Sequence, residues 1–131
     1  MDKVYFDTNI WIYHLQGISE WKTKARELIK ETIDRDNTIV ISSMFFTEFL
    51  AGRQGEYNLE KLLSRMDAVN NLELEIVHPL NAIYAGELRQ KYELRTPDAI
   101  HLATAIKSGC KTFWTGDKRL QKVKEIEVKV F

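Results

Sequence analysis

Hydrophobic and polar residues along this chain follow two kinds of spacing. Short apolar runs, typical of strands buried on both faces, are separated by longer segments in which apolar residues recur every three or four positions. The runs predict strands at residues 3–7, 38–42, 110–115 and 126–131. At residues 72–76 aliphatic side chains alternate with glutamates, which predicts a strand with one wet face near a sheet edge.

The helical spacing fills the segments between these strands. It predicts helices that begin after residue 7 and at 19–36, 44–51, 59–69, 81–92 and 96–109, with a loop at 53–58. Ser43 and Thr96 are expected as N-caps, Pro97 as the first helical residue after Thr96, and Gly52 and Gly109 as helix ends. Strands that alternate with helices predict an α/β sandwich with a mainly parallel sheet.

Composition narrows the class of protein only slightly. With 131 residues and 44% hydrophobic content, we expect a single domain over residues 1–131. Nineteen basic and 19 acidic residues cancel, so any contact with nucleic acid has to come from local basic clusters. The single Cys110 permits no intrachain disulfide and favours a reducing compartment. Because no apolar run approaches the ~20 residues of a membrane span, we expect a cytoplasmic protein without membrane contact.

Four carboxylates stand where a strand ends or a helix begins. They are Asp7, Glu48, Asp98 and Asp117. The carboxyl ends of strands in an open α/β sheet meet at one crevice, so these residues can share a site. Like charges gathered there would repel one another unless hard cations such as Mg²⁺ or Mn²⁺ neutralised them. The pattern therefore points to metal-assisted phosphodiester chemistry.

Each acid also has a plainer interpretation, and taken singly none is decisive. Asp7 could cap a helix, and Asp98 lies in a first helical turn, where the helix dipole favours an acid. Glu48 lies among aromatic residues and could form a salt bridge, while Asp117 could cap a turn. His101 is one turn beyond Asp98, where packing or hydrogen bonding is a better expectation than metal binding.

Taken together, the order of these motifs resembles the PIN domain. The resemblance runs over essentially the whole chain, and the size and motif order are similar to those of VapC-type toxins. It rests on Asp7-Thr8-Asn9, on the segment 43–52 with Glu48, on Thr96-Pro97-Asp98-Ala99-Ile100-His101-Leu102-Ala103-Thr104-Ala105, and on Thr115-Gly116-Asp117-Lys118.

The resemblance implies a three-layer α/β/α sandwich and a Mg²⁺- or Mn²⁺-dependent endoribonuclease, the toxin of a type II toxin–antitoxin pair. It also implies a homodimer that a small antitoxin protein holds inactive. The four acids would then be both catalytic residues and ligands of one or two metal ions.

Residues around the acids have implied roles as well. Thr8 and Asn9 serve either the first helical turn or the orientation of Asp7. Gly116 departs from the polar residue that related sequences often carry, so Thr115 or backbone would have to supply that contact. The RNA substrate would meet basic side chains in loops and at helix ends, namely Arg53, Arg89, Lys91, Arg95, Lys118 and Arg119, of which Arg53, Arg95, Lys118 and Arg119 are the main candidates.

Other classes fit less well. A haloacid-dehalogenase-like phosphotransferase would carry a second aspartate where Asn9 stands, and a receiver module needs an early acidic pair and a later lysine at a strand end. One alternative stays open, a PIN domain that acts in RNA processing or as a metal-dependent RNA-binding module.

Overall fold

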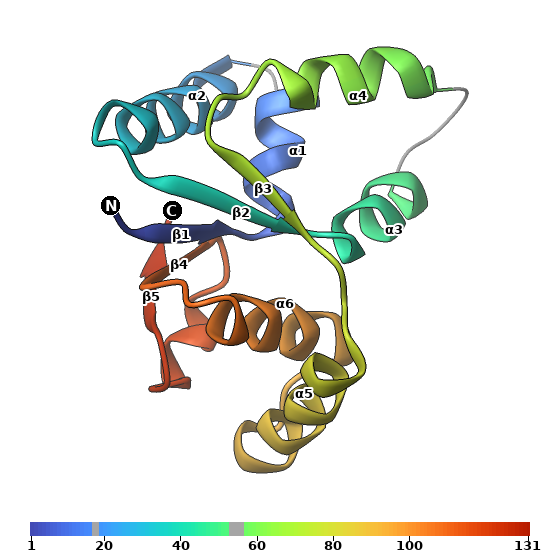
Figure 1. Cartoon of the computed structure of the whole chain (residues 1–131), viewed down its shortest axis with the longest axis vertical. Coiled ribbons are helices and arrows are strands. Elements are labelled where there is room, and N and C mark those ends of the chain that lie inside the picture. Colours follow the sequence, from blue (N-terminus) through green and yellow to red (C-terminus); the bar gives the residue numbers. More distant parts are fainter. Residues whose placement is uncertain (17–18, 53–56) are drawn as a thin grey trace.

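A five-stranded parallel sheet forms the centre of the structure (Figure 1). The computed structural model describes residues 1–16, 19–52 and 57–131. The strands follow the order β3-β2-β1-β4-β5, with every neighbouring pair parallel. Their bounds are β1 (Lys3–Phe6), β2 (Thr38–Ser42), β3 (Leu72–Glu75), β4 (Thr112–Thr115) and β5 (Glu127–Val130). The strand at 72–76 is therefore at an edge, as its alternation predicted.

Helices cover both faces of the sheet, which confirms the predicted three-layer sandwich (Figure 1). On one face lie α1 (Thr8–Gln16), α2 (Ser19–Asp34), α3 (Met44–Ala51) and α4 (Leu59–Asp67). On the other lie α5 (Pro79–Tyr92), α6 (Thr96–Lys107) and a short 3₁₀ helix, η1 (Lys118–Lys122). No helix within the described ranges is long and apolar enough to cross a membrane.

The central strand shows why the apolar runs are continuous. Val4 and Phe6 pack against α1–α4, while Tyr5 between them packs in the cluster formed with α5 and α6. Successive side chains of a strand point to opposite faces, so both faces of β1 need apolar residues. Trp11 and Phe45 are fully buried in the α1–α4 layer and form part of its core.

The predicted element ends need small corrections. Ser43 is the N-cap of α3, but its side chain forms no capping bond; the Ser42 hydroxyl accepts from Met44 N–H instead, at 3.0 Å. Thr96 is the first helical residue of α6, and Arg95 is the N-cap. The fifth helix begins at Pro79 rather than residue 81, because proline suits a first turn. Strand β4 begins two residues later than predicted but ends at Thr115 as predicted, and β5 is one residue shorter than predicted at each end.

The strand order places two of the candidate acids side by side. Consecutive strands β1, β2 and β3 run toward one edge of the sheet, and β4 then pairs with β1 on its other side. The order reverses between β1 and β4, the position at which α/β sheets commonly bind ligands. Asp7 follows β1, and its N–H donates to Trp114 O of β4 at 2.9 Å. Asp117 follows β4, so both acids lie at the carboxyl end of this strand pair.

Candidate active site

Asp7 is buried and is held by two hydrogen bonds. Only 8% of its surface is exposed. Oδ1 accepts from Thr8 N–H at 2.9 Å, and Oδ2 accepts from the Thr115 hydroxyl at 2.8 Å. Burial raises the pKa of Asp7 above its usual range, although these hydrogen bonds oppose the shift. The carboxylate is thus fixed in direction but carries a charge that its surroundings disfavour.

Glu48 is joined to Asp7 through Thr8 and His101. The Thr8 hydroxyl donates to Glu48 Oε1 at 2.7 Å, and His101 Nε2 contacts the same oxygen and lies 3.9 Å from Asp7 Oδ1. Burial works to raise the pKa of Glu48, but the hydrogen bonds from His101 and Thr8 outweigh it and hold that pKa below its usual range. Glu48 is therefore a carboxylate with stable partners on a partly exposed helix face.

Tyr5 of β1 positions the His101 ring through a hydrogen bond on the side away from Glu48. Its hydroxyl lies 2.5 Å from Nδ1 of the fully buried His101. Burial raises the pKa of Tyr5 well above its usual range, so the phenol keeps its proton. With that phenol as donor to Nδ1, His101 carries its proton on Nε2 and donates toward Glu48.

Asp98 and Asp117 each form an ion pair with a nearby arginine. Arg95 donates to Asp98 Oδ2 at 3.0 Å and Oδ1 at 3.4 Å, and Arg119 donates to Asp117 Oδ1 at 3.0 Å and Oδ2 at 2.8 Å. All four residues line one small pocket together with Glu93, Leu94, Leu120 and Lys122. The hydrogen bond from Arg119 lowers the pKa of Asp117. Asp117 also caps η1, with Oδ1 accepting from Arg119 N–H at 2.9 Å, so its plainer interpretation as a turn cap holds too.

The four acids form one electrostatic neighbourhood but no closed ligand set. The charge of Asp98 contributes to raising the pKa of Asp7, and Asp98 and Asp117 share a pocket. Over residues 1–16, 19–52 and 57–131, no three acidic, histidine or cysteine side chains lie close enough to hold one ion in this arrangement. The donors themselves are hard carboxylate oxygens, which suit Mg²⁺ or Mn²⁺, and the arginines that engage two of them are mostly exposed.

The residues predicted to support the acids divide into two groups. Thr8 and Thr115 contact the carboxylates, and Thr115 supplies the contact that Gly116 lacks. Asn9 is exposed, and none of its contacts within the described residues ties it to Asp7. The sequence analysis missed Tyr5 altogether. Its position two residues before Asp7, on the same face of β1, is the signal that could have identified it.

The predicted substrate contacts also divide. Arg95 and Arg119 are at the acids, and Lys118 is exposed at the start of η1. Arg89 instead donates to Leu94 O at 3.0 Å, and Lys91 pairs with Glu125 at 3.3 Å, so both serve to join segments of the fold. Arg53 lies outside the described residues.

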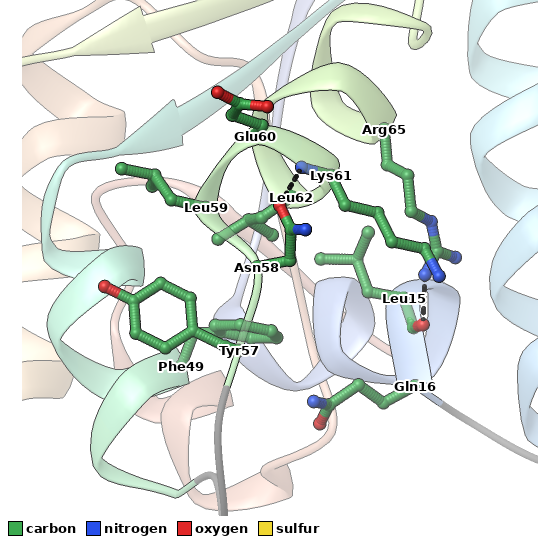
Figure 2. A pocket seen from close by; sticks show the side chains of 10 residues that line it. All are labelled: Leu15, Gln16, Phe49, Tyr57, Asn58, Leu59, Glu60, Lys61, Leu62 and Arg65. Atoms are coloured by element: carbon green, nitrogen blue, oxygen red, sulfur yellow. Dashed lines mark hydrogen bonds between the residues drawn. The ribbon is translucent and has the colours of Figure 1, made fainter.

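Among the hollows lined by described residues, a separate groove is much larger than the pocket at Asp98 and Asp117, and none of the four acids lines it. It has a volume of about 810 Å³ and is formed by the end of α1, the end of α3 and the start of α4 (Figure 2). Apolar and basic side chains surround it, namely those of Leu15, Phe49, Tyr57, Leu59, Leu62, Lys61 and Arg65, together with Gln16, Asn58 and Glu60. Thr8 and Glu48 of the acidic site lie on two of the same helices, α1 and α3.

Comparison with known families agrees with this fold. The model of the PIN domain family matches residues 4–126. The chain belongs to this family. A relative of the PIN domain described here is Ribonuclease VapC2 of Methanocaldococcus jannaschii, which is 30% identical over 121 residues, covering 79% of this chain and 76% of the relative.

Solved structures share the PIN fold over nearly the full length. A chain of VapBC from Salmonella typhimurium, determined bound to DNA, superposes with a TM-score of 0.72 at 20% identity and covers 99% of this chain and 98% of its own. VapBC2 from Rickettsia felis, bound to a DNA fragment from its promoter, gives 0.69 at 22% identity with 98% of both chains covered. A toxin–antitoxin complex from Klebsiella pneumoniae gives 0.66 at 24% identity with 94% of both covered.

Replacing Thr115 by valine in this PIN domain tests the support of Asp7. The change keeps the shape but removes the donor to Asp7 Oδ2, so the pKa of Asp7 should rise further. When folding raises the pKa of an acid, the protein loses stability as the pH rises from the pKa of that acid in the unfolded chain, about 3.9, through its pKa in the folded protein. We therefore expect Thr115→Val to lower the free energy of unfolding by about 1–3 kcal/mol at pH 7 and by less near pH 4.

Chemical denaturation at both pH values measures this difference. Thr112→Val, the same substitution at another buried position of β4, is the matched control and should show no such pH dependence. An equal loss of stability at pH 7 and pH 4 in Thr115→Val would contradict the assigned role.

Proposed function

We propose that this PIN domain is a metal-dependent endoribonuclease that hydrolyses RNA phosphodiester bonds and is the toxin of a type II toxin–antitoxin pair. The observation that carries the proposal is that Asp7 and Asp117 follow β1 and β4, that Thr8 and His101 link Glu48 to Asp7, and that Asp98 shares a pocket with Asp117. A relative named as a ribonuclease and structural neighbours described as VapBC or toxin–antitoxin complexes support the same function.

In this proposal the four carboxylates hold Mg²⁺ or Mn²⁺. When bound, such a cation supplies an activated water and stabilises negative charge on the phosphate and the leaving oxygen. Asp7 is the fixed member of the set, because Thr8 and Thr115 already direct both of its oxygens. His101 and Thr8 orient Glu48, so their role is to position a ligand rather than to transfer the proton themselves.

Positive charge for the substrate backbone is present around the same pocket. Arg95, Lys118 and Arg119 are exposed and lie beside Asp98 and Asp117. Phosphate contacts of this kind position a nucleic acid without reading its sequence. Neutral overall charge is therefore compatible with RNA binding, since only this local cluster has to meet the backbone.

The groove of Figure 2 is proposed to receive a helix of the antitoxin. Tyr57 and Leu59 are 45% and 52% exposed at its rim, so an apolar helix face would cover them. Phe49 in the groove directly follows Glu48 of the acidic site, and α1 connects the two places over roughly 10 Å. A protein seated in the groove is thus near enough to extend a basic side chain toward the acids.

A second apolar surface is proposed as the homodimer face. Leu74, Ile76, Leu80 and Ile83 are each more than half exposed and follow one another from the edge strand β3 into α5. In Figure 1 this segment runs down the side of the molecule opposite the chain termini. A two-fold axis would bring the same patch of both copies together, and homodimer interfaces are typically apolar.

Replacing Asp7 by asparagine should abolish RNA cleavage while preserving the fold. An asparagine can still accept from Thr8 N–H and donate to the Thr115 hydroxyl, but it removes a charged ligand. We expect metal-dependent cleavage of a mixed RNA pool to fall by about two orders of magnitude or more. The metal-free protein should be equally or more stable, because burial disfavours the Asp7 charge.

The control is Asp67→Asn, an exposed acid on α4, which should keep full activity. Unchanged cleavage in Asp7→Asn would show that the active site lies elsewhere. Binding of RNA without cleavage by the wild type, with either Mg²⁺ or Mn²⁺, would instead favour an RNA-binding module.

Replacing Leu59 by glutamate should weaken antitoxin binding without affecting assembly of the toxin. The partner for this test would be the product of a small gene adjacent to the gene for this chain, expressed together with it. A buried charge at an apolar contact should weaken the complex by about tenfold or more in a titration of purified proteins. Equal affinity of wild type and Leu59→Glu would exclude this groove as the binding place.

Replacing Leu80 and Ile83 together by glutamate should produce a monomer. Light scattering of the wild type at micromolar concentration should give twice the chain mass of 15.3 kDa, and the double variant should give that mass itself. Leu59→Glu is the matched control and should remain dimeric, because Leu59 lies on the other apolar surface. A monomeric wild type would overturn the dimer.

A further inference from the structure

In the two arginine–aspartate ion pairs of the acidic site, the arginines bind the carboxylate oxygens that a metal ion would need. Arg95 reaches both oxygens of Asp98, and Arg119 reaches both oxygens of Asp117. A carboxylate held in this bidentate way has fewer lone pairs directed toward the pocket. A cation that takes Asp98 or Asp117 as a ligand therefore has to displace at least one guanidinium N–H.

Both pairs are local in sequence and open to solvent on the arginine side. Arg95 is three residues before Asp98, and Arg119 is two residues after Asp117. The arginine side chains are 70% and 75% exposed, whereas the Asp98 side chain is only 11% exposed. The acids are thus held in place by the fold, while the arginines can rotate into water at little cost.

The remaining acids are satisfied in a different manner. Thr8 and Thr115 hold Asp7, and the buried His101 holds Glu48. The groups that hold these two acids, Thr8, Thr115 and His101, are themselves buried and fixed by the core. Among the described partners of the acids, Arg95 and Arg119 are the exposed ones and can move without disturbing the core.

We infer that Arg95 and Arg119 are built-in counter-ions, which neutralise Asp98 and Asp117 in the metal-free protein and compete with the divalent cation for them. This inference rests on the proposed metal site. As a consequence, repulsion between the acids is reduced in the metal-free protein. The site also binds a metal ion more weakly than the four carboxylates would without the arginines. Once displaced, the two guanidinium groups stand beside the pocket with free donors for a phosphate.

Binding of Mn²⁺ to the RNA-free protein tests the competition directly. The free ion is measured by electron paramagnetic resonance at fixed ionic strength, for the wild type, Arg95→Gln, Arg119→Gln and the double variant. Each exposed ion pair contributes little free energy, so a cation can displace it at small cost. Each single substitution should therefore tighten Mn²⁺ binding by about two- to fivefold, and the double substitution by about tenfold. The rise in Tm on adding Mn²⁺ should be larger in the double variant than in the wild type, because its metal-free site has lost its counter-ions.

Lys122→Gln is the matched control. Lys122 lines the same pocket, but in the described part of the chain it forms no ion pair with a carboxylate. It therefore removes the same charge without freeing a ligand, and should change Mn²⁺ affinity by about 1.5-fold or less. Arg95→Lys keeps the charge but loses the two-point contact, and should fall between wild type and Arg95→Gln.

The outcomes separate this inference from the proposed function. If the wild type binds Mn²⁺ and the double variant binds it equally or more weakly, the role of the arginines as counter-ions is overturned, while the proposed metal site stands. Equal tightening by Lys122→Gln would overturn them too, because general charge would then explain the effect. Failure of the wild type and all variants to bind Mn²⁺ would contradict the metal site itself, and the inference with it.

Discussion

The site is organised around one constraint, the presence of several negative charges at the carboxyl edge of a sheet whose interior is apolar. Asp7 is 8% exposed, and burial raises its pKa, so an unsupported charge there would cost stability. Backbone N–H of Thr8 and the Thr115 hydroxyl compensate for part of this cost. Every other feature of the site can be understood as a further means of holding like charges together.

Three different partners solve this problem for the other acids. His101, fixed by Tyr5, holds Glu48; Arg95 holds Asp98; and Arg119 holds Asp117. The partners differ in mobility, since a buried imidazole cannot leave whereas an exposed guanidinium can. A site assembled in this way has a rigid half, built on β1, α3 and the interior of α6, and an adjustable half at the start of α6 and η1. The adjustable half also provides the positive charge suited to an RNA backbone.

The position of the apolar surfaces follows from the same topology. Helix α1 begins at the acidic site and its other end lines the groove of Figure 2, while α3 carries Glu48 of the site and, next to it, Phe49 of the groove. In the proposed function, a partner in that groove and a substrate at the acids would contact opposite ends of α1 and adjacent residues of α3. The β3–α5 surface is separate from both, so dimerisation and inhibition can use different faces.

The sequence by itself determined the class of fold and singled out the four acids as candidates for the site. Apolar runs and helical spacing were enough to place nearly every element, because a sheet buried on both faces and helices packed on one side leave distinct periods. Element ends were less predictable, as Ser42 and Arg95 show, because a cap depends on backbone angles that composition does not specify.

Only the tertiary structure decided which side chains meet at the acids. Tyr5 and His101 are 96 residues apart in the chain, and their contact exists only because β1 and α6 pack together. Tertiary structure likewise showed that Arg95 and Arg119 already occupy two of the carboxylates, since the direction of a long exposed side chain is set by the charges around it rather than by spacing along the chain.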